Sequence, residues 1–201
     1  MLQTTDLILL QLTLEQSAVP DFKQGLAAWI GLCPIRLKLQ RCARSSETGL
    51  TYVYLELLER TRLDETVLST MTTLLKTRFP VAQEIQLARL EKVFERSGHS
   101  SRDPAVFHYV VEMDPDSGWM PELERWYDTE HMPGLAAVPG CIRAARLYNH
   151  DQGPLSLACY DLVSTQTLGS DPWLAVRGTP WSDIVRPHFT HTKRTMFEVL
   201  G

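Results

Sequence analysis

The feature that most constrains this chain is an internal repeat with a period of about one hundred residues. An apolar, β-branched run at residues 5–14 predicts a strand, and a similar run at residues 105–113 predicts another. Each run opens a comparable series of elements. The sequence therefore predicts two consecutive copies of one α+β unit.

Within each copy, the hydrophobic spacing predicts the order strand, helix, strand, strand, helix, strand. The first copy assigns these elements to residues 5–14, 19–32, 35–44, 50–58, 64–79 and 89–95. The second assigns them to residues 105–113, 119–135, 142–148 and 155–163, a helical stretch broken by Pro172, Pro180 and Pro187, and residues 193–198. The predicted topology is βαββαβ, twice.

A βαββαβ unit forms a four-stranded antiparallel sheet with both helices on one face. The strand at 105–113 is apolar on both sides, with Tyr109 and Val111 on one and His108 and Val110 on the other. Because both faces then need burial, we expect the two sheets to pack face to face around a shared interior. The expected units span residues 1–97 and 102–201, joined by a linker (SGHSS) that is flexible by composition.

Composition excludes several classes of function. The 44% of hydrophobic residues is enough for a packed core, and the net charge of −4 lacks the positive field of a nucleic-acid-binding protein. The apolar run at residues 7–10 follows Asp6 and ends at Gln11, which predicts neither a signal peptide nor a membrane span. We therefore expect neither nucleic acid nor a membrane as a partner.

The cysteines are sparse and form no C-x-x-C pair; they are Cys33, Cys42, Cys141 and Cys159. Such usage is typical of reduced thiols in a cytoplasmic protein.

The most informative segment is residues 119–140. At 100° per residue, Trp126, Tyr127, Glu130 and His131 share one arc of the predicted helix with apolar residues. Asp128 lies three residues before His131, close enough to accept from one imidazole nitrogen and fix its tautomer. Ionisable groups on an inward face indicate a site. The alternative is that the phenol and imidazole are structural, with their polar ends satisfied by the backbone.

These residues resemble a known superfamily. The run YDTEHMP at 127–133, with VPG at 138–140 and an arginine-bearing strand after it, resembles the dimeric α+β barrel superfamily, particularly its EthD-like members. The resemblance covers about thirty residues of the second half, whereas the first half has no Tyr-x-x-x-His motif. It implies two ferredoxin-like units paired around a small-molecule cavity, here within one chain. Members include cofactor-independent monooxygenases, polyketide cyclases, muconolactone isomerases and haem enzymes.

Other candidates lie outside the motif. His108 stands on the strand where some polyketide cyclases of this superfamily use a histidine, although a buried structural histidine is the alternative. Arg143 is a candidate clamp for a carboxylate or phenolate, but Arg36 at the equivalent place of the first copy favours a structural role. The remaining candidates for substrate binding are Trp126, Glu130, Trp181, His191 and Arg194.

No dinucleotide, P-loop, hydrolase-elbow or zincin motif is present in the sequence. His188 and His191 would lie on opposite faces of a strand, so we expect no metal site. No cofactor is predicted, and haem is kept as an alternative.

The leading hypothesis is a cofactor-independent enzyme acting on a small aromatic or polyketide-like metabolite. His131 would be the general base, Tyr127 would stabilise an enolate or phenolate, Asp128 would orient the imidazole and His108 would return the proton. Tyr127 and His131 are expected to project into the hollow between the two sheets. The reaction would be that of a lyase, isomerase or cyclase, or of a monooxygenase if the enolate reacts with O₂.

Two alternatives use the same fold: a non-catalytic protein that binds a small ligand or haem, and a structural protein whose interior is filled by side chains. The expected partner is a small molecule. The chain would be a monomer through its internal pair, or a homodimer through its outer surfaces.

Overall fold

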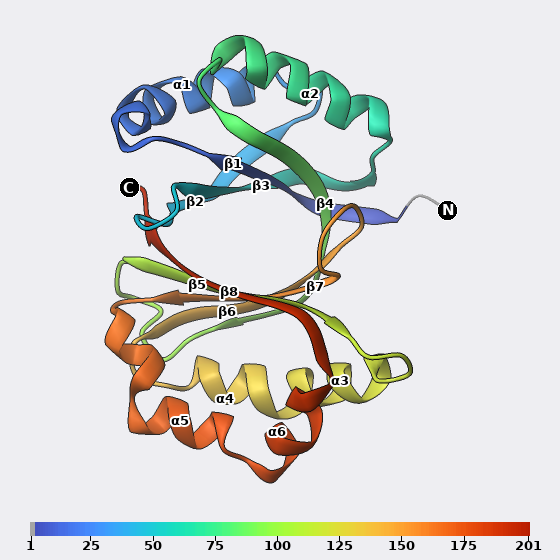
Figure 1. Ribbon diagram of the computed structural model, residues 1–201, viewed down its shortest axis with the longest axis vertical. Coiled ribbons are helices and arrows are strands. Elements are labelled where there is room, and N and C mark those ends of the chain that lie inside the picture. Colours follow the sequence, from blue (N-terminus) through green and yellow to red (C-terminus); the bar gives the residue numbers. More distant parts are fainter. Residues whose placement is uncertain (1–2) are drawn as a thin grey trace. The chain divides into compact units, whose positions relative to one another are not determined.

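The computed structural model describes residues 3–201, which form two compact units (Figure 1). Unit 1 contains the described residues up to Glu91 together with residues 149–152 and 197–201. Unit 2 contains residues 92–148 and 153–196. The division therefore falls within two strands, β4 (Gln83–Ser97) and β8 (Phe189–Val199), each of which contributes to both units.

Unit 1 is an antiparallel sheet covered on one face by two helices (Figure 1). Its strands lie in the order β4, β1, β3, β2, and the end of β8 pairs with β2. The elements are β1 (Thr4–Thr13), α1 (Val19–Leu32), β2 (Leu37–Arg44), β3 (Leu50–Arg62) and α2 (Glu65–Arg78), with a short 3₁₀ turn at Gln16–Ala18. Aliphatic side chains such as Ile8, Leu10 and Leu12 fill the space under the helices.

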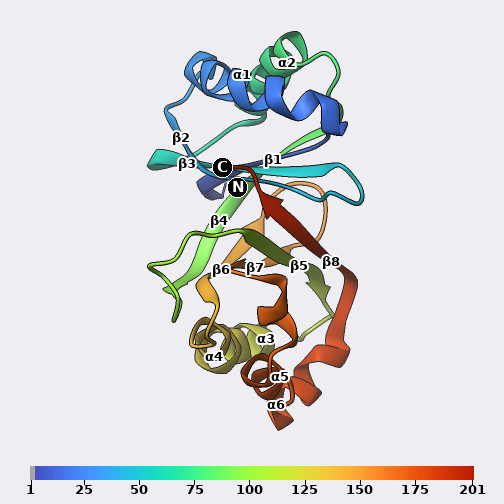
Figure 2. The same cartoon turned by 90° about the vertical axis from the view of Figure 1, so that its left-hand side faces the viewer.

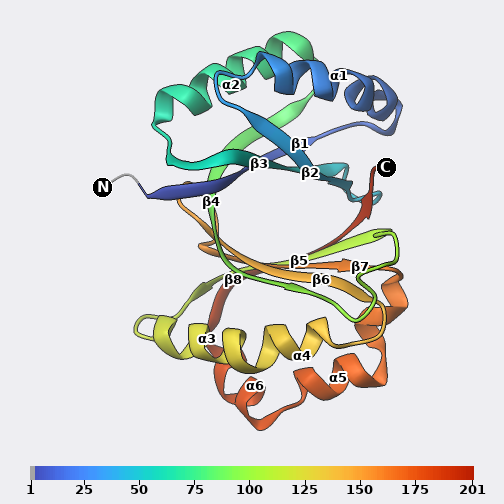
Figure 3. The ribbon, with the colours of Figure 1, turned by 180° about the vertical axis from the view of Figure 1, so that it is seen from behind.

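Unit 2 repeats this plan, and its helices also cover one face of its sheet (Figure 3). The strands are β5 (Phe107–Pro115), β6 (Cys141–Asn149) and β7 (Ser156–Leu162), in the order β8, β5, β7, β6, β4. The helices are α3 (Met120–Trp126), α4 (Met132–Ala136), α5 (Asp171–Arg177) and α6 (Pro180–Val185). Short 3₁₀ turns at Thr165–Gly169 and Arg186–His188 flank α5 and α6.

The predicted fold class is confirmed: the chain is α+β, with the βαββαβ order present twice. Helix α1 covers the residues that the spacing predicts, because Pro20 fits the first helical turn and the apolar positions fall on one face. The alternation predicted for β5 also holds. Val111 faces the helices and Val110 the opposite side of the sheet.

The predicted flexible linker differs from the structure. Gly98 N–H donates to the carbonyl of Ile142, and His99 N–H donates to the carbonyl of Ala136, both at 2.8 Å. A Cβ atom at Gly98 would clash with the carbonyl of Cys141, so glycine is needed for this close approach. Backbone hydrogen bonds therefore fix a segment whose composition predicts freedom.

The predicted helix at 119–135 contains a turn of π-helix, η2 (Tyr127–His131), between α3 and α4. The N–H of Met132 donates to the carbonyl of Tyr127, five residues back. Pro133 has no N–H and its ring crowds the preceding turn, which disfavours regular α-helical bonding there. The wider turn changes the directions in which Tyr127 and His131 point.

None of the helices within residues 3–201 is long and apolar enough to cross a membrane. All four cysteines carry free thiols.

Candidate active site

A small cavity lies in unit 2, between the sheet and the helices that cover it; Figure 2 shows α3 beside the sheet and α5 and α6 farther from it. The lining residues are aromatic, aliphatic or cationic: Tyr109, Val111, Trp126, Tyr127, His131, Leu135, Tyr160, Trp173, Arg177, Arg186, Phe189 and Arg194. Its volume is about 30 Å³. A space of this size holds about one water-sized group, so only the reacting end of a ligand could enter it.

His131 is the buried imidazole of this cavity, with 8% of its surface exposed. Its ring stacks on Trp126 with centroids 4.1 Å apart, and Tyr127 meets it edge-on at 5.6 Å. Burial lowers the pKa of His131 to about 3, and the charges of Arg186 and Arg177 add to that effect. The imidazole is therefore neutral at pH 7.

Tyr127 is equally enclosed. Its ring stacks with Phe189 at a centroid distance of 6.2 Å, and the guanidinium of Arg146 lies 5.3 Å from the ring centroid. Burial raises the pKa of Tyr127 well above its ordinary value, although Arg146 and Arg194 oppose the shift. The phenol consequently keeps its proton and is a hydrogen-bond donor at neutral pH.

Three buried ring nitrogens of cavity-lining residues have no hydrogen-bond partner among the described residues: Nδ1 of His131 and Nε1 of Trp126 and Trp173. In unit 1, by contrast, the indole of Trp29 donates to the carbonyl of Met71. Buried polar groups are normally satisfied, so three unsatisfied ones at one place indicate a site that binds a polar group.

Three arginines line the same cavity: Arg177 at the end of α5, Arg186 in the turn after α6, and Arg194 on β8. In the part of the chain that the structure describes, no carboxylate lies within 4 Å of any of the three. Burial and the charges of Arg177 and Arg194 lower the pKa of Arg186. The guanidinium groups thus repel one another without a fixed counter-ion.

A backbone irregularity directs Arg194 into the cavity. Phe189 and Arg194 both line it, although strict alternation would place an odd and an even residue on opposite faces of β8. His191, between them, has a φ of 47°, which a non-glycine residue seldom adopts. An irregularity of this kind shifts the alternation by one residue.

The structure brings together four of the residues predicted for the site: Trp126, Tyr127, His131 and Arg194. They lie between the helices and the sheet of unit 2. The expectation that Tyr127 and His131 enter a hollow on the other side of the sheet is therefore wrong. A helix that covers one face of a sheet directs its inward side chains onto that face and cannot reach the opposite one.

Three predicted residues of the helical segments do not line the cavity. The carboxylate of Asp128 accepts from Arg146 at 2.9 Å and does not orient His131, whose Nδ1 is unpartnered. Glu130 accepts a hydrogen bond from the hydroxyl of Thr179 at 2.6 Å. The indole of Trp181 donates to Glu122 at 2.8 Å. The first contact holds this segment to β6, and the other two hold it to α6 and to the residue that caps α6.

Three predicted residues of the strands also lie outside the cavity. Alternation places two of them, His108 and Arg143, on the opposite face of the sheet. There Asp161, 1% exposed, is 2.8 Å from Nδ1 of His108 and 2.9 Å from Nε of Arg143. The side chain of His191 is 79% exposed, and its Nδ1 lies 2.9 Å from Asp114.

Sequence reasoning missed Arg177 and Arg186. Both stand in the proline-broken segment, where helical periodicity gives no inward face. The available signal was composition: the second half has only eight basic residues, and four of them fall between residues 177 and 194 on the last elements, namely Arg177, Arg186, Lys193 and Arg194.

Haem does not fit the cavity of unit 2. Residues 3–201 contain no cluster of three or more histidine, cysteine, aspartate or glutamate residues that could hold a metal ion. For haem, the cavity beside His131 is far smaller than a porphyrin.

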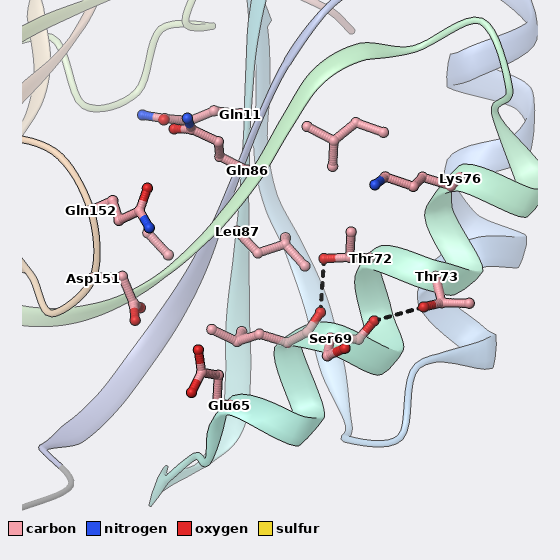
Figure 4. A pocket seen from close by; sticks show the side chains of 13 residues that line it. Gln11, Glu65, Ser69, Thr72, Thr73, Lys76, Gln86, Leu87, Asp151 and Gln152 are labelled. Carbon is pink, nitrogen blue, oxygen red and sulfur yellow. Dashed lines mark hydrogen bonds between the residues drawn. The ribbon is translucent and has the colours of Figure 1, made fainter.

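A larger groove of about 510 Å³ lies in unit 1 between α2 and β4 (Figure 4). Apart from Leu68, its helical side is polar and consists of Glu65, Ser69, Thr72, Thr73 and Lys76. The hydroxyls of both threonines donate to backbone carbonyls one turn earlier and so are already satisfied. None of the residues that line this groove has an unpartnered buried side-chain nitrogen or oxygen. The unpartnered ring nitrogens belong to residues that line the smaller cavity of unit 2.

No protein-family model and no curated protein matches the sequence. Solved structures with a similar fold include an anthrone oxidase-like protein, with a TM-score of 0.65 and 13% identity, over 98% of this chain and 92% of the other. A candidate monooxygenase of Fusobacterium nucleatum subsp. nucleatum has a TM-score of 0.65 and 11% identity, over 100% and 94%.

A third similar structure is a ferredoxin-fold protein of Listeria monocytogenes related to antibiotic biosynthesis monooxygenases, with a TM-score of 0.57 and 9% identity, over 100% and 97%. At these identities the likeness shows the fold, which is that of a tandem ferredoxin-like protein.

Proposed function

We propose that the unit 2 cavity is the active site of a cofactor-independent enzyme that removes a proton from a small aromatic or polyketide-like metabolite. The observation that carries the proposal is the group of three unpartnered ring nitrogens around one cavity, one of them the neutral imidazole of His131. The folds of an anthrone oxidase-like protein and a candidate monooxygenase support it. The motif at residues 127–133 supports EthD-like membership.

In this mechanism, His131 takes a proton from an acidic C–H or phenol at the reacting end of the substrate. The C–H or O–H bond breaks, its electron pair becomes an enolate or phenolate, and the proton forms an N–H bond on the imidazole. Tyr127, which keeps its proton, donates a hydrogen bond to the oxygen that gains charge. The new anion next to the imidazolium offsets the cost of charging a buried ring.

Two outcomes are open to the enolate. It can be protonated again or rearrange, as in an isomerase, lyase or cyclase, or it can react with O₂, as in a monooxygenase. Neither Asp128 nor His108 lines the cavity, so His131 itself returns the proton in this mechanism.

The test uses anthrone as the probe, since it carries an acidic C–H group and O₂ converts it to anthraquinone and water. We expect wild-type protein to accelerate this oxidation, followed by absorbance and O₂ consumption. His131→Ala should lower the rate by about 10²- to 10⁴-fold, the range for loss of a general base. The matched control is His99→Gln, at an exposed histidine of unit 2 outside the cavity, which should retain the wild-type rate.

An unchanged rate in a folded His131→Ala variant would remove this residue from the mechanism. The alternative is a non-catalytic protein that binds a small ligand, and the tight packing of the cavity favours it. Recovery of a co-purified compound, chemically unchanged after incubation with O₂, would select that alternative.

A further inference from the structure

We propose that Arg177, Arg186 and Arg194 form an anion subsite at the mouth of the unit 2 cavity, which binds the carboxylate of an aryl carboxylate substrate. The inference rests on the proposed function, and it names the substrate class that the function leaves open.

The first argument is charge. Three guanidinium groups line one small cavity, and in the described portion of the chain no carboxylate pairs with them. Asp183 opposes the lowering of the Arg186 pKa but forms no ion pair with Arg186. The guanidinium group of Arg186 donates to the carbonyl of Arg177 at 3.4 Å. Clustered cations that repel one another are stabilised when an anion binds between them.

The second argument is hydrogen-bonding chemistry. Guanidinium groups and indole N–H groups can only donate. The buried, unpartnered nitrogens of Trp126 and Trp173 require acceptors, and the arginines add further donors. A carboxylate has only acceptors, and it matches the planar guanidinium group in shape. The donors of the cavity therefore select an oxygen-rich anion over a neutral group that must also donate.

The third argument is the nature of the walls. Apart from the arginines and His131, the lining is made of rings and aliphatic side chains, among them Tyr109, Tyr160 and Phe189. A cavity of about 30 Å³ admits only the edge of an aromatic ring, and that edge packs favourably against such walls. The combination of aromatic walls with neighbouring arginines fits an aryl carboxylate better than inorganic phosphate.

The subsite would also act on the proposed base. Arg186 and Arg177 contribute to the depressed pKa of His131. A carboxylate bound between them cancels part of their charge and raises that pKa. The imidazole would thus become a better proton acceptor when substrate is present.

The experiment measures binding and needs no turnover. Isothermal titration at pH 7 and low salt would compare benzoate, its neutral analogue benzamide, and inorganic phosphate. We expect benzoate to bind wild-type protein at least about tenfold more tightly than benzamide, with weaker binding at higher salt. Arg177→Gln, Arg186→Gln and Arg194→Gln should each weaken benzoate binding about tenfold and leave benzamide unchanged.

The control is Arg102→Gln, an equal loss of charge at an exposed arginine of unit 2 that does not line the cavity. It should bind benzoate as the wild type does. Thermal unfolding of each variant checks its folding. If Arg186→Gln does not fold, Arg186→Lys replaces it, because lysine keeps the positive charge at this position.

Three results would overturn the proposal: equal affinity for benzoate and benzamide, unchanged benzoate affinity in the arginine variants, or tighter binding of phosphate than of benzoate. Failure of the proposed function is distinguishable from these. Arginine-dependent binding of benzoate, with no turnover of any substrate tested, would leave the subsite in place and reject the enzyme.

Discussion

His131 should make unit 2 lose stability as the pH falls, and His131→Phe should remove that loss. Burial lowers the pKa of this imidazole from 6.5 to about 3 in the folded protein. Below pH 6.5 the imidazole of His131 binds a proton in the unfolded chain but stays unprotonated in the folded protein. The contribution of neutral His131 to the free energy of unfolding is therefore fully present above pH 6.5 and is lost as the pH falls toward 3.

The magnitude follows from the two pKa values. Between pH 7 and pH 5 the protonation of the unfolded imidazole lowers the free energy of unfolding by about 2 kcal/mol. The full shift corresponds to about 5 kcal/mol, reached only below pH 3. Phenylalanine keeps the stacking on Trp126 and removes the unpartnered Nδ1, so the variant should be at least as stable as the wild type at pH 7.

The assay is urea unfolding at pH 7 and pH 5, followed by tryptophan fluorescence. Four of the five tryptophans lie in unit 2, so the signal reports mainly on the unit that contains His131. The control is Val138→Ala, a buried, non-titrating change outside the cavity, which should lower the stability equally at both pH values. If the free energy of unfolding of His131→Phe falls between pH 7 and pH 5 by as much as that of the wild type, the imidazole of His131 is not a buried neutral group.

Two further predictions concern residues that hold unit 2 together. Asp161→Ala removes the shared acceptor of His108 and Arg143 and should lower the free energy of unfolding by about 3–5 kcal/mol, measured by urea denaturation; a loss below 1 kcal/mol would contradict this. Gly98→Ala should cost about 1–3 kcal/mol because the new Cβ would clash with a backbone carbonyl of β6. Gly31→Ala, in α1 with open space around it, should instead raise stability by about 0.5–1 kcal/mol, and the same sign in both variants would refute the steric argument.

The fold could be predicted because local patterns agree with it. Helix α1 and the alternation of β5 follow from apolar spacing alone, and the repeat supplies the order of elements. The site was predictable only where one regular element carries it. Tyr127 and His131 lie in one segment and both reach the cavity, although the π-turn moves them off the 100° spacing.

The rest of the site depends on geometry that periodicity does not encode. Arg194 reaches the cavity because the backbone at His191 shifts the alternation of β8. Arg177 and Arg186 reach it because α5 and α6 are short and fold back over the sheet. His108 and Arg143 were plausible candidates by residue type, but the register of β5, β6 and β7 places them with Asp161 on the other face.

The difference between the two units explains why only one of them carries a candidate site. In both units helices cover a sheet, yet the corresponding layer of unit 1 is filled mainly by aliphatic side chains, with Phe22, Trp29 and Phe79 among them. The indole of Trp29 is satisfied by a backbone carbonyl. In unit 2 the same layer contains rings with unpartnered nitrogens, and three arginines border it. An arrangement of this kind costs stability unless a ligand completes it. Unit 1, which lacks such a layer, can supply stability, while unit 2 retains the unsatisfied donors that binding requires.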